Sequence, residues 1–277
     1  MLTAARAVSR SAASSDPLPD VPALAALVAA GVQPRRGTLI LIAALPKAGK
    51  SNFVMWWVKE MGLPCLYFSA DMNGYDATTR LAASVTGHNI EAVRKGIASP
   101  SGAAFYEDAL EEVPIQWCFD SSPTVEDLWL ELDAYVEAYD AYPQVIVVDT
   151  LMKVQASEEY AGQQYIMAEL SAMARVTGAA VFVLHHCSEA EWKEPTRPPK
   201  RSAILNKISQ LPELVLTVAL DGTLFHVAYV ANRSGPSDPE AKRYVTLDAD
   251  VAHSRFGYHN PYAYSGYGGY TADPERD

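Results

Sequence analysis

The sequence has little cysteine and no excess of positive charge. Its three cysteines, Cys65, Cys118 and Cys187, lack the spacing of a metal-binding motif, and an odd number without an evident signal peptide favours a reducing compartment. Cys65 and Cys118 lie within apolar runs, so we expect both to be buried. Lys and Arg number 22 against 33 Asp and Glu, a formal net charge of -11. This balance argues against a uniformly basic coat for nucleic acid but leaves room for a local basic groove.

Long hydrophobic runs are also absent. No apolar stretch approaches the roughly 18 residues that a membrane-spanning helix needs, so we expect no membrane partner. Hydrophobic residues make up 49% and charged residues 20% of the chain, as in ordinary globular proteins. With 277 residues, the chain can bury one large core or two small ones.

What the sequence does contain is an alternation of apolar runs and helical periodicity. Strands are expected over 38–44, 65–70, 114–119, 144–149 and 179–186, and helices over 22–32, 50–62, 74–87, 89–98, 124–140 and 161–176. The last third of the chain shows strand-like runs with little helix between them. This order predicts an α/β fold, a mostly parallel sheet with an antiparallel C-terminal edge.

The segment from Ala44 to Ser51, ALPKAGKS, has the pattern of a phosphate-binding loop in which Ala44 replaces the usual first glycine. A strand-like run precedes it and a helical pattern follows it, which is the context that this motif requires. Gly49 would let the backbone approach the phosphates, Lys50 would reach the β- and γ-phosphates, and Ser51 would hold Mg²⁺. The alternative, a chance Gly-Lys-Ser in a turn, does not account for the strand and helix on either side.

The loop and the first turn after it supply the residues expected to contact a nucleotide. They are Ala44, Pro46, Lys47, Ala48, Gly49, Lys50, Ser51 and Asn52. Lys47 is an addition to the usual motif, and it could touch phosphate, contact an adjacent subunit or face solvent. The site is therefore predicted to take ATP with Mg²⁺.

Two acidic residues each follow a predicted strand. Asp149 ends the run QVIVVD, the Walker B pattern, where its carboxylate would orient the water shell of Mg²⁺ near Ser51. Asp71 follows the run LYFSA, where a buried carboxylate could accept a hydrogen bond from the water that attacks the γ-phosphate. Asp71 could instead cap the helix expected from residue 74. Because Asp is one methylene shorter than Glu, hydrolysis could be slow.

Longer segments resemble a known family. The stretch LYFSADMNGYDATTRLAAS is similar to the second-strand region of DnaB-class replicative helicases, with Asp71 after the strand and Arg80 on the next helix. VIVVDTL and VANRSGP follow in the order of that family, and PKAGKS, VIVVDTL and VLHH look equally like the small RepA-type plasmid helicases. The resemblance covers roughly residues 35–257. Its first motifs are shared by all RecA-like ATPases, and the later ones are more particular to hexameric helicases.

The resemblance implies a RecA-like P-loop core with helices on both faces of a twisted sheet, assembled as a hexameric ring or a helical filament. ATP would bind between subunits, and loops that face the channel would hold single-stranded DNA. Carried over from the family motifs, Lys50 and Ser51 would bind phosphate and Mg²⁺, and Asp149 would be the Walker B acid.

Three further residues match functional positions of that family. Asp71 matches the catalytic glutamate, His186 a polar sensor that couples the γ-phosphate to the DNA loop, and Arg233 an arginine finger that reaches the neighbour's ATP. Two departures predict slow hydrolysis. The catalytic glutamate is an aspartate here, and Ala231 stands where DnaB-class proteins usually have lysine.

The resemblance also divides the chain. Residues 1–36 would form an N-terminal arm, whose 22–32 helix resembles the linker that docks on an adjacent subunit. Residues 37–257 would form the ATPase domain, and residues 258–277 a disordered Gly/Tyr-rich tail. The collar domain of DnaB has no counterpart, which suits a phage or plasmid protein that acts in the cytoplasm of a bacterial host cell.

A candidate DNA-contacting loop covers residues 187–207. Its best candidates for phosphate contact are Lys200, Arg201 and Lys207. Trp192 in the same loop could stack on a base. Three glutamates dilute the positive charge, so a solvated surface loop is the alternative interpretation.

These features together predict an ATP-dependent motor on single-stranded DNA that works as a homo-oligomer in DNA replication, with other replication proteins as possible partners. One alternative is a RecA-like recombination or annealing protein that uses ATP to switch DNA binding. Another is a regulatory P-loop ATPase that binds a protein partner and no DNA.

Overall fold

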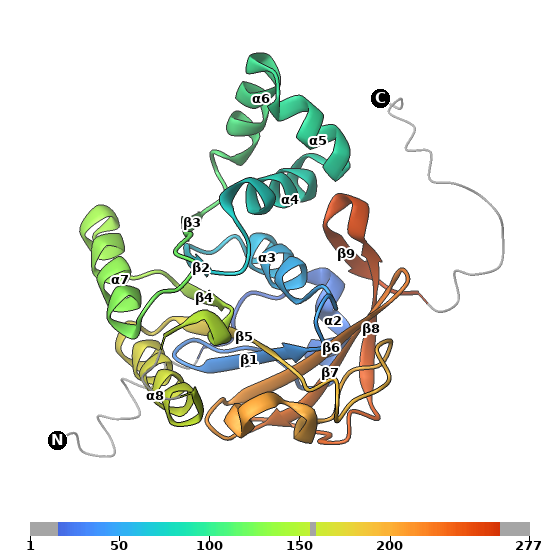
Figure 1. Ribbon diagram of the computed structural model, residues 1–277. Coiled ribbons are helices and arrows are strands. Elements are labelled where there is room, and N and C mark those ends of the chain that lie inside the picture. The colour runs from blue at the N-terminus through green and yellow to red at the C-terminus, as the bar shows by residue number, and fades with distance from the viewer. Residues whose placement is uncertain (1–15, 156–158, 261–277) are drawn as a thin grey trace.

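The computed structural model describes residues 16–155 and 159–260, which fold around one nine-stranded sheet of order β3-β2-β4-β5-β1-β6-β7-β8-β9 (Figure 1). The Tyr-rich tail from residue 261 and the first 15 residues of the expected N-terminal arm lie outside the described residues. Within the part of the chain that the structure describes, none of the helices has the length and hydrophobicity required to span a bilayer.

One half of the sheet is parallel. Its strands are β1 (Leu39–Ala44), β2 (Cys65–Ser69), β3 (Ile115–Cys118), β4 (Val145–Asp149), β5 (Ala180–His186) and β6 (Leu214–Asp221). The central strand β1 pairs in parallel with β5 on one side and β6 on the other. All six residues of β1 are buried, as expected of a strand that is covered on both faces.

The other half is antiparallel and confirms the expected C-terminal edge. It is formed by β6 together with β7 (Leu224–Asn232), β8 (Tyr244–Asp250) and β9 (Arg255–Tyr258). The short strand β9 was not expected. It includes Tyr258, and the neighbouring His259 hydrogen-bonds Asp248 of β8, so ordered structure continues past the predicted end of the domain at residue 257.

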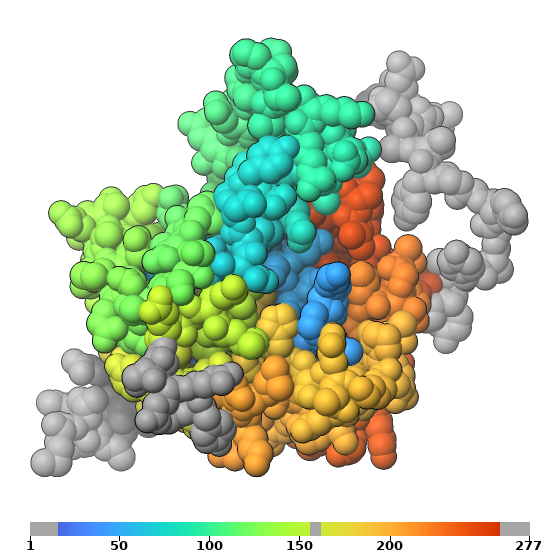
Figure 2. Space-filling model, in the orientation of Figure 1, coloured from blue at the N-terminus to red at the C-terminus, as the bar shows by residue number. Residues whose placement is uncertain are grey.

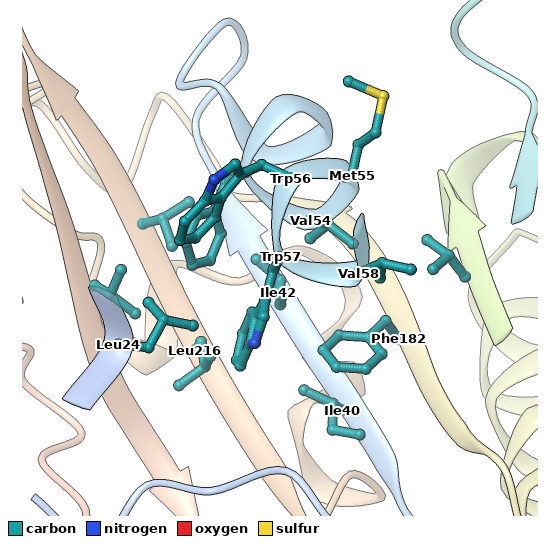
Figure 3. Packing of buried hydrophobic residues seen from close by; sticks show 14 of the residues in the cluster. Leu24, Ile40, Ile42, Val54, Met55, Trp56, Trp57, Val58, Phe182 and Leu216 are labelled. Carbon is teal, nitrogen blue, oxygen red and sulfur yellow. The ribbon is translucent and has the colours of Figure 1, made fainter. Parts of the chain in front are cut away.

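Helices cover both faces of the sheet. The main ones are α3 (Lys50–Met61), α4 (Gly74–Thr86), α7 (Val125–Tyr139) and α8 (Glu159–Thr177). Because side chains alternate along β1, Ile40 and Ile42 join the core cluster that contains Phe53 of α3, while Leu39 and Leu41 join the cluster that contains residues of α7 and α8. Figure 3 shows the first cluster, in which Val54, Trp57 and Val58 of α3 lie against Ile40, Ile42 and Phe182.

The helices agree with the sequence pattern apart from one omission. Thr124 and Asp127 form the predicted capping box at the start of α7, since each side chain accepts from the other's backbone N–H. The omission is α6 (Pro100–Leu110), which follows α5 (Ile90–Ile97). Its first residues, Pro-Ser-Gly, look like a turn, but Pro100 occupies the first helical turn and the Ser99 side chain caps it by accepting from the Gly102 N–H.

The segment before β1 belongs to the domain rather than to a separate arm. The Leu18 N–H donates to the Pro34 carbonyl and the Arg36 N–H to that of Asp16, both at 2.9 Å. The expected helix is present as η1 (Pro22–Leu24) and α2 (Ala25–Ala29), and Leu24 and Leu27 are buried in the core of the same chain. Its apolar side chains are therefore not available for the predicted docking on an adjacent subunit.

The cysteines differ in exposure. Cys65 in β2 is buried as predicted, and burial raises the pKa of its thiol. The prediction for Cys118 is wrong, because this residue ends β3 at the outer edge of the sheet and is only half-buried.

Candidate nucleotide-binding site

The predicted phosphate loop opens a cavity of about 490 Å³ at the carboxyl edge of the parallel strands. Residues Pro46, Lys47, Gly49, Lys50, Ser51 and Asn52 line it. Ala44 and Ala48, also predicted to contact the nucleotide, are buried and do not line it. Figure 2 shows the face of the molecule on which the loop, in blue, is exposed between the helices and the yellow and orange C-terminal third. The position matches the crevice where open α/β sheets bind their ligands.

The backbone explains why the missing glycine is tolerated. Ala44 is the last residue of β1 and keeps the extended conformation of a strand, which any residue can adopt. Left-handed conformations occur later in the loop, at Lys47 with a φ of 62° and at Gly49 with a φ of 80°. Gly49 meets this requirement without strain, whereas Lys47 adopts a conformation that costs non-glycine residues about 1–2 kcal/mol. The side chain of Lys47 is exposed at the rim of the cavity.

Lys50 is a largely buried cation. Its side chain lines the cavity although the residue is only 7% exposed, and burial lowers the pKa of its ammonium while the charges of Asp149, Cys187 and Asp71 oppose that shift. Among the described residues, no carboxylate lies within salt-bridge distance of this ammonium. A buried, unpaired cation favours an anionic ligand, and phosphate fits both its charge and the backbone N–H groups at the start of α3.

Asp149 lies behind the loop rather than in the cavity wall. It ends β4 with 1% exposure, and burial raises the pKa of its carboxyl. Hydrogen bonds from Ser51 and Tyr67 and the charge of Lys50 oppose this shift and favour the ionised form. A carboxylate that holds the Ser51 hydroxyl from behind fits the predicted arrangement, in which Ser51 faces Mg²⁺ and Asp149 acts through bound water.

Unsatisfied polar atoms support a ligand in this cavity. Six buried side-chain atoms of the described residues lack a hydrogen-bond partner, and three of these belong to residues that line the cavity. They are Asn52 Oδ1, His186 Nδ1 and Ser254 Oγ. Because an unsatisfied buried polar group costs about 1–3 kcal/mol, a polar ligand would relieve part of this cost. The residues present therefore fit a phosphorylated nucleotide and its divalent cation.

The structure brings Asp71, Arg80 and His186 to the same cavity. Asp71 is exposed, so the expectation of a buried carboxylate is wrong. It is also not the helix cap, because the Asn73 side chain accepts from the Asp76 N–H at 2.9 Å and caps α4. Asp71 thus keeps its carboxylate free to face a ligand. Burial and the charge of Lys50 lower the pKa of His186, so its ring is neutral at pH 7.

Arg233 is not brought to this cavity. It follows β7, is exposed, and its guanidinium donates to the Gln210 carbonyl at 2.9 Å. It does not appear among the residues that line the cavity. This placement excludes a role in the nucleotide site of its own chain and leaves the predicted role in a neighbour's site open.

The candidate DNA-contacting residues divide into two kinds. Lys207 is exposed, and Lys200 is half-buried. Arg201 is occupied, since its guanidinium donates to the Ser209 carbonyl at 2.9 Å and to the Ser209 hydroxyl at 3.2 Å. Trp192 packs against the core, and its indole N–H donates to the carbonyls of Glu194 and Arg197, so the suggested base stacking would require it to leave these partners.

The sequence did not reveal the far wall of the cavity. Ile90 of α5, Leu220 and Phe225 of the β6–β7 hairpin, and Val251, Ser254 and Phe256 of the β8–β9 hairpin form it. Its apolar side chains suit the flat base of a nucleotide. These residues carry no local motif, because only long-range antiparallel pairing brings them to the phosphate loop.

Comparisons with known proteins agree with this site and fold. The AAA domain family model matches residues 21–191. The gene 65 protein of Mycobacterium phage L5 is 32% identical over 245 residues, covering 85% of this chain and 90% of that protein. The gene 65 protein of Mycobacterium phage D29 is 30% identical over 220 residues, covering 76% of this chain and 94% of that protein.

Two solved structures share the fold. One is a DnaB-like replicative helicase described with its interactions with primase, with a TM-score of 0.75, 17% identity, and coverage of 94% of this chain and 68% of that one. The other is an isolated ATPase domain, with a TM-score of 0.76, 19% identity, and coverage of 93% of this chain and 98% of that one. These similarities confirm the expected RecA-like fold of the DnaB type. The chain belongs to the AAA domain family and groups with the gene 65 proteins of mycobacteriophages.

Proposed function

We propose that this protein is an ATP-driven motor on single-stranded DNA that acts in DNA replication and hydrolyses ATP at the interfaces between its own subunits. One observation carries the proposal. A single cavity contains the phosphate loop, the acid Asp71 and the sensor candidate His186, while Arg233 of the same chain lies elsewhere. Such a site has the parts for nucleotide binding but needs a cation from a neighbour to complete it.

The roles follow from charge and position. Lys50 and the N-terminus of α3 would hold the β- and γ-phosphates, and Ser51, oriented by Asp149, would hold Mg²⁺. Bound Mg²⁺ would supply charge neutralisation on the phosphate oxygens. Asp71 would accept a hydrogen bond from the attacking water, which orients that water toward the γ-phosphate. His186, neutral and with an unpartnered Nδ1, would respond to the γ-phosphate.

The neighbouring subunit and DNA would complete the cycle. Arg233 of one subunit would approach the nucleotide of the next, as an arginine finger does. Lys207 and Lys200 would contact the phosphates of single-stranded DNA through the loop that follows β5. A hexameric ring suits this arrangement, and a helical filament satisfies the same contacts. Replication proteins such as a primase are candidate partners, because one structural relative is described with its primase.

One observation favours a second candidate. The exposed Asp71 is shorter than the glutamate of the helicase class, which predicts slow turnover. A slow ATPase is better suited to switching DNA affinity than to driving unwinding, as in a RecA-like annealing or recombination protein.

A forked-duplex assay with purified protein separates the candidates. The proposed motor should show ATP turnover that rises on addition of single-stranded DNA, and it should unwind the fork with ATP. Lys50→Ala should abolish both activities. Strand pairing without unwinding would support the second candidate. Turnover that does not respond to single-stranded DNA would contradict both candidates and favour a regulatory ATPase, and turnover unchanged in Lys50→Ala would remove the nucleotide site itself.

A further inference from the structure

Tyr67 contacts the acid that lies behind the nucleotide site. It stands in the middle of β2, is fully buried, and its hydroxyl oxygen lies 3.1 Å from Asp149 Oδ2. In the parallel pairing of β2 with β4, Tyr67 is opposite Val147 and Ser69 is opposite Asp149. Tyr67 and Asp149 are therefore diagonal neighbours on one face of the sheet, the face that carries α3.

The direction of this hydrogen bond is fixed by charge. Burial and the nearby carboxylate of Asp149 raise the pKa of Tyr67 well above the usual value, so the phenol keeps its proton. A protonated phenol can donate to an ionised carboxylate, and such a bond is stronger than one between neutral groups. Tyr67 thus offers Asp149 a permanent donor on the side away from the cavity.

The tyrosine ring has little freedom to move. Trp117 is its partner in the neighbouring edge strand β3, and the two ring centroids are 4.4 Å apart at an interplanar angle of 35°. Phe119 stacks on the other side of Trp117, with centroids 5.5 Å apart at 6°. These three rings, which we name the aromatic column, hold the Tyr67 hydroxyl in place from the edge of the sheet.

Asp149 needs such support because it is short of partners. It is buried, does not line the cavity, and acts on a cation only if its carboxylate keeps one orientation toward Ser51. A carboxylate held only by Ser51 could rotate about its terminal torsion, which is broad for Asp. The second hydrogen bond, on Oδ2, removes that freedom.

We infer that Tyr67 is a positioning residue for the Mg²⁺ of the nucleotide complex: its hydroxyl fixes the Asp149 carboxylate, which in turn orients Ser51 and the water shell of the cation. The inference rests on the proposed function, because it concerns the same nucleotide site. Partners of this kind, one step removed from the cation, change metal affinity by about 10- to 100-fold when they are lost.

Tyr67→Phe removes one oxygen and keeps the ring in the aromatic column. Tyr106→Phe is a matched control, since Tyr106 is also buried and its hydroxyl also makes one hydrogen bond, to His88 Nδ1 at 2.9 Å. Binding of a fluorescent ADP analogue is measured by anisotropy, first in EDTA and then across a Mg²⁺ titration. Thermal unfolding of each variant without nucleotide shows whether the fold is kept.

In EDTA, we expect Tyr67→Phe to bind the analogue within about twofold of the unsubstituted protein. The Mg²⁺ concentration that gives half of the affinity gain should rise about tenfold in Tyr67→Phe and stay unchanged in Tyr106→Phe. An equal Mg²⁺ midpoint in all three proteins would overturn the inference while leaving the proposed function intact. A parallel loss of binding in EDTA would also overturn it, because Tyr67 would then support the whole site. If the unsubstituted protein shows no Mg²⁺-dependent nucleotide binding, the proposed function fails together with the inference.

Discussion

At the scale of single residues, the nucleotide site is defined by groups whose environments differ sharply. Lys50 and Asp149 are buried close enough to influence each other's pKa, whereas Asp71 reaches the same cavity from an exposed position. Burial explains why Lys50 should bind an anion, and exposure explains why Asp71 can meet a water molecule. The two acids therefore have separable roles, and substitutions at Asp71 should affect turnover rather than nucleotide binding.

Asp71 is the most direct residue to vary. Asp71→Asn keeps the shape and removes the charge, so it should lower ATP turnover by about 100-fold or more while nucleotide affinity stays within a few-fold. Asp71→Glu restores the length found in the helicase class and should raise turnover several-fold. Steady-state hydrolysis and equilibrium nucleotide binding measure the two effects. Normal turnover in Asp71→Asn would show that another group orients the water.

His185 should make the free energy of unfolding depend on pH. Burial lowers the pKa of this histidine to about 4, and its Nε2–H donates to the Leu205 carbonyl. The unfolded chain, with an ordinary pKa near 6.5, binds a proton that the folded chain refuses, so this stability is present above pH 6.5 and is lost as the pH falls through 4. Between pH 7 and pH 4.5 the contribution should fall by roughly 2–3 kcal/mol.

Urea unfolding across this pH range measures the effect. His185→Gln retains a donor but does not titrate, so its free energy of unfolding should fall less steeply between pH 7 and pH 4.5. Equal slopes for the two proteins would show that His185 does not keep its depressed pKa in solution.

At the scale of elements, the β8–β9 hairpin closes the far end of the nucleotide cavity. Arg255 at the start of β9 fastens this hairpin to the end of α4, donating to the Ser84 carbonyl at 2.8 Å and the Val85 carbonyl at 3.1 Å. A cation at a helix C-terminus also interacts favourably with the helix dipole. The position of Ser254 and Phe256 in the cavity wall thus depends on a contact made by the residue between them.

Arg255→Ala should therefore weaken nucleotide binding several-fold and lower the free energy of unfolding by about 1–2 kcal/mol. Arg94→Ala serves as the control, because Arg94 makes only exposed ion pairs with Glu91 and Asp76, which contribute little. Isothermal titration with an ATP analogue and chemical denaturation provide the two readouts. An Arg255→Ala protein with unchanged nucleotide affinity would show that β9 is held by its strand pairing alone.

The elements also show what sequence could and could not predict. The unit of β1, phosphate loop and α3 was predictable because its pattern is local: an apolar run, Gly-Lys-Ser and helical periodicity in one stretch. The wall that contains Ser254 and Phe256 was not, because it depends on the pairing of β7, β8 and β9. Helix α6 was missed because Pro100 and Gly102 favour a turn in isolation. The helix before β1 was predicted correctly, but its packing partner was not, since periodicity shows that a face is apolar and not what covers it.

At the scale of the whole molecule, the net charge of -11 limits how DNA can be held. Binding would depend on a few cations in the loop after β5 rather than on a basic surface. Of the three candidates, Lys207 is exposed and Arg201 is engaged with Ser209. Affinity for single-stranded DNA should therefore be modest and easily reduced by salt.

With at most three phosphate contacts per subunit, the logarithm of the affinity should fall with the logarithm of salt concentration with a slope of about -2 per subunit. Lys207→Ala should make this slope shallower without changing stability. Arg201→Ala should lower stability as well, because it breaks two hydrogen bonds to Ser209. Anisotropy titrations of a labelled oligonucleotide at several salt concentrations measure the slope, and identical slopes for Lys207→Ala and the unsubstituted protein would exclude Lys207 from the DNA contact.

The central claim is that ATP is hydrolysed between subunits, with Arg233 supplied by the neighbour. ATP turnover is best measured in mixtures of two inactive variants at fixed total concentration. Lys50→Ala lacks the phosphate contact but retains Arg233, and Arg233→Ala has the reverse defect. In a mixed assembly, an intact phosphate loop can lie beside an intact Arg233, so the account predicts that mixtures regain turnover that neither variant shows alone, with a maximum near equal proportions. Turnover that stays at the level of the separate variants in every mixture would contradict it.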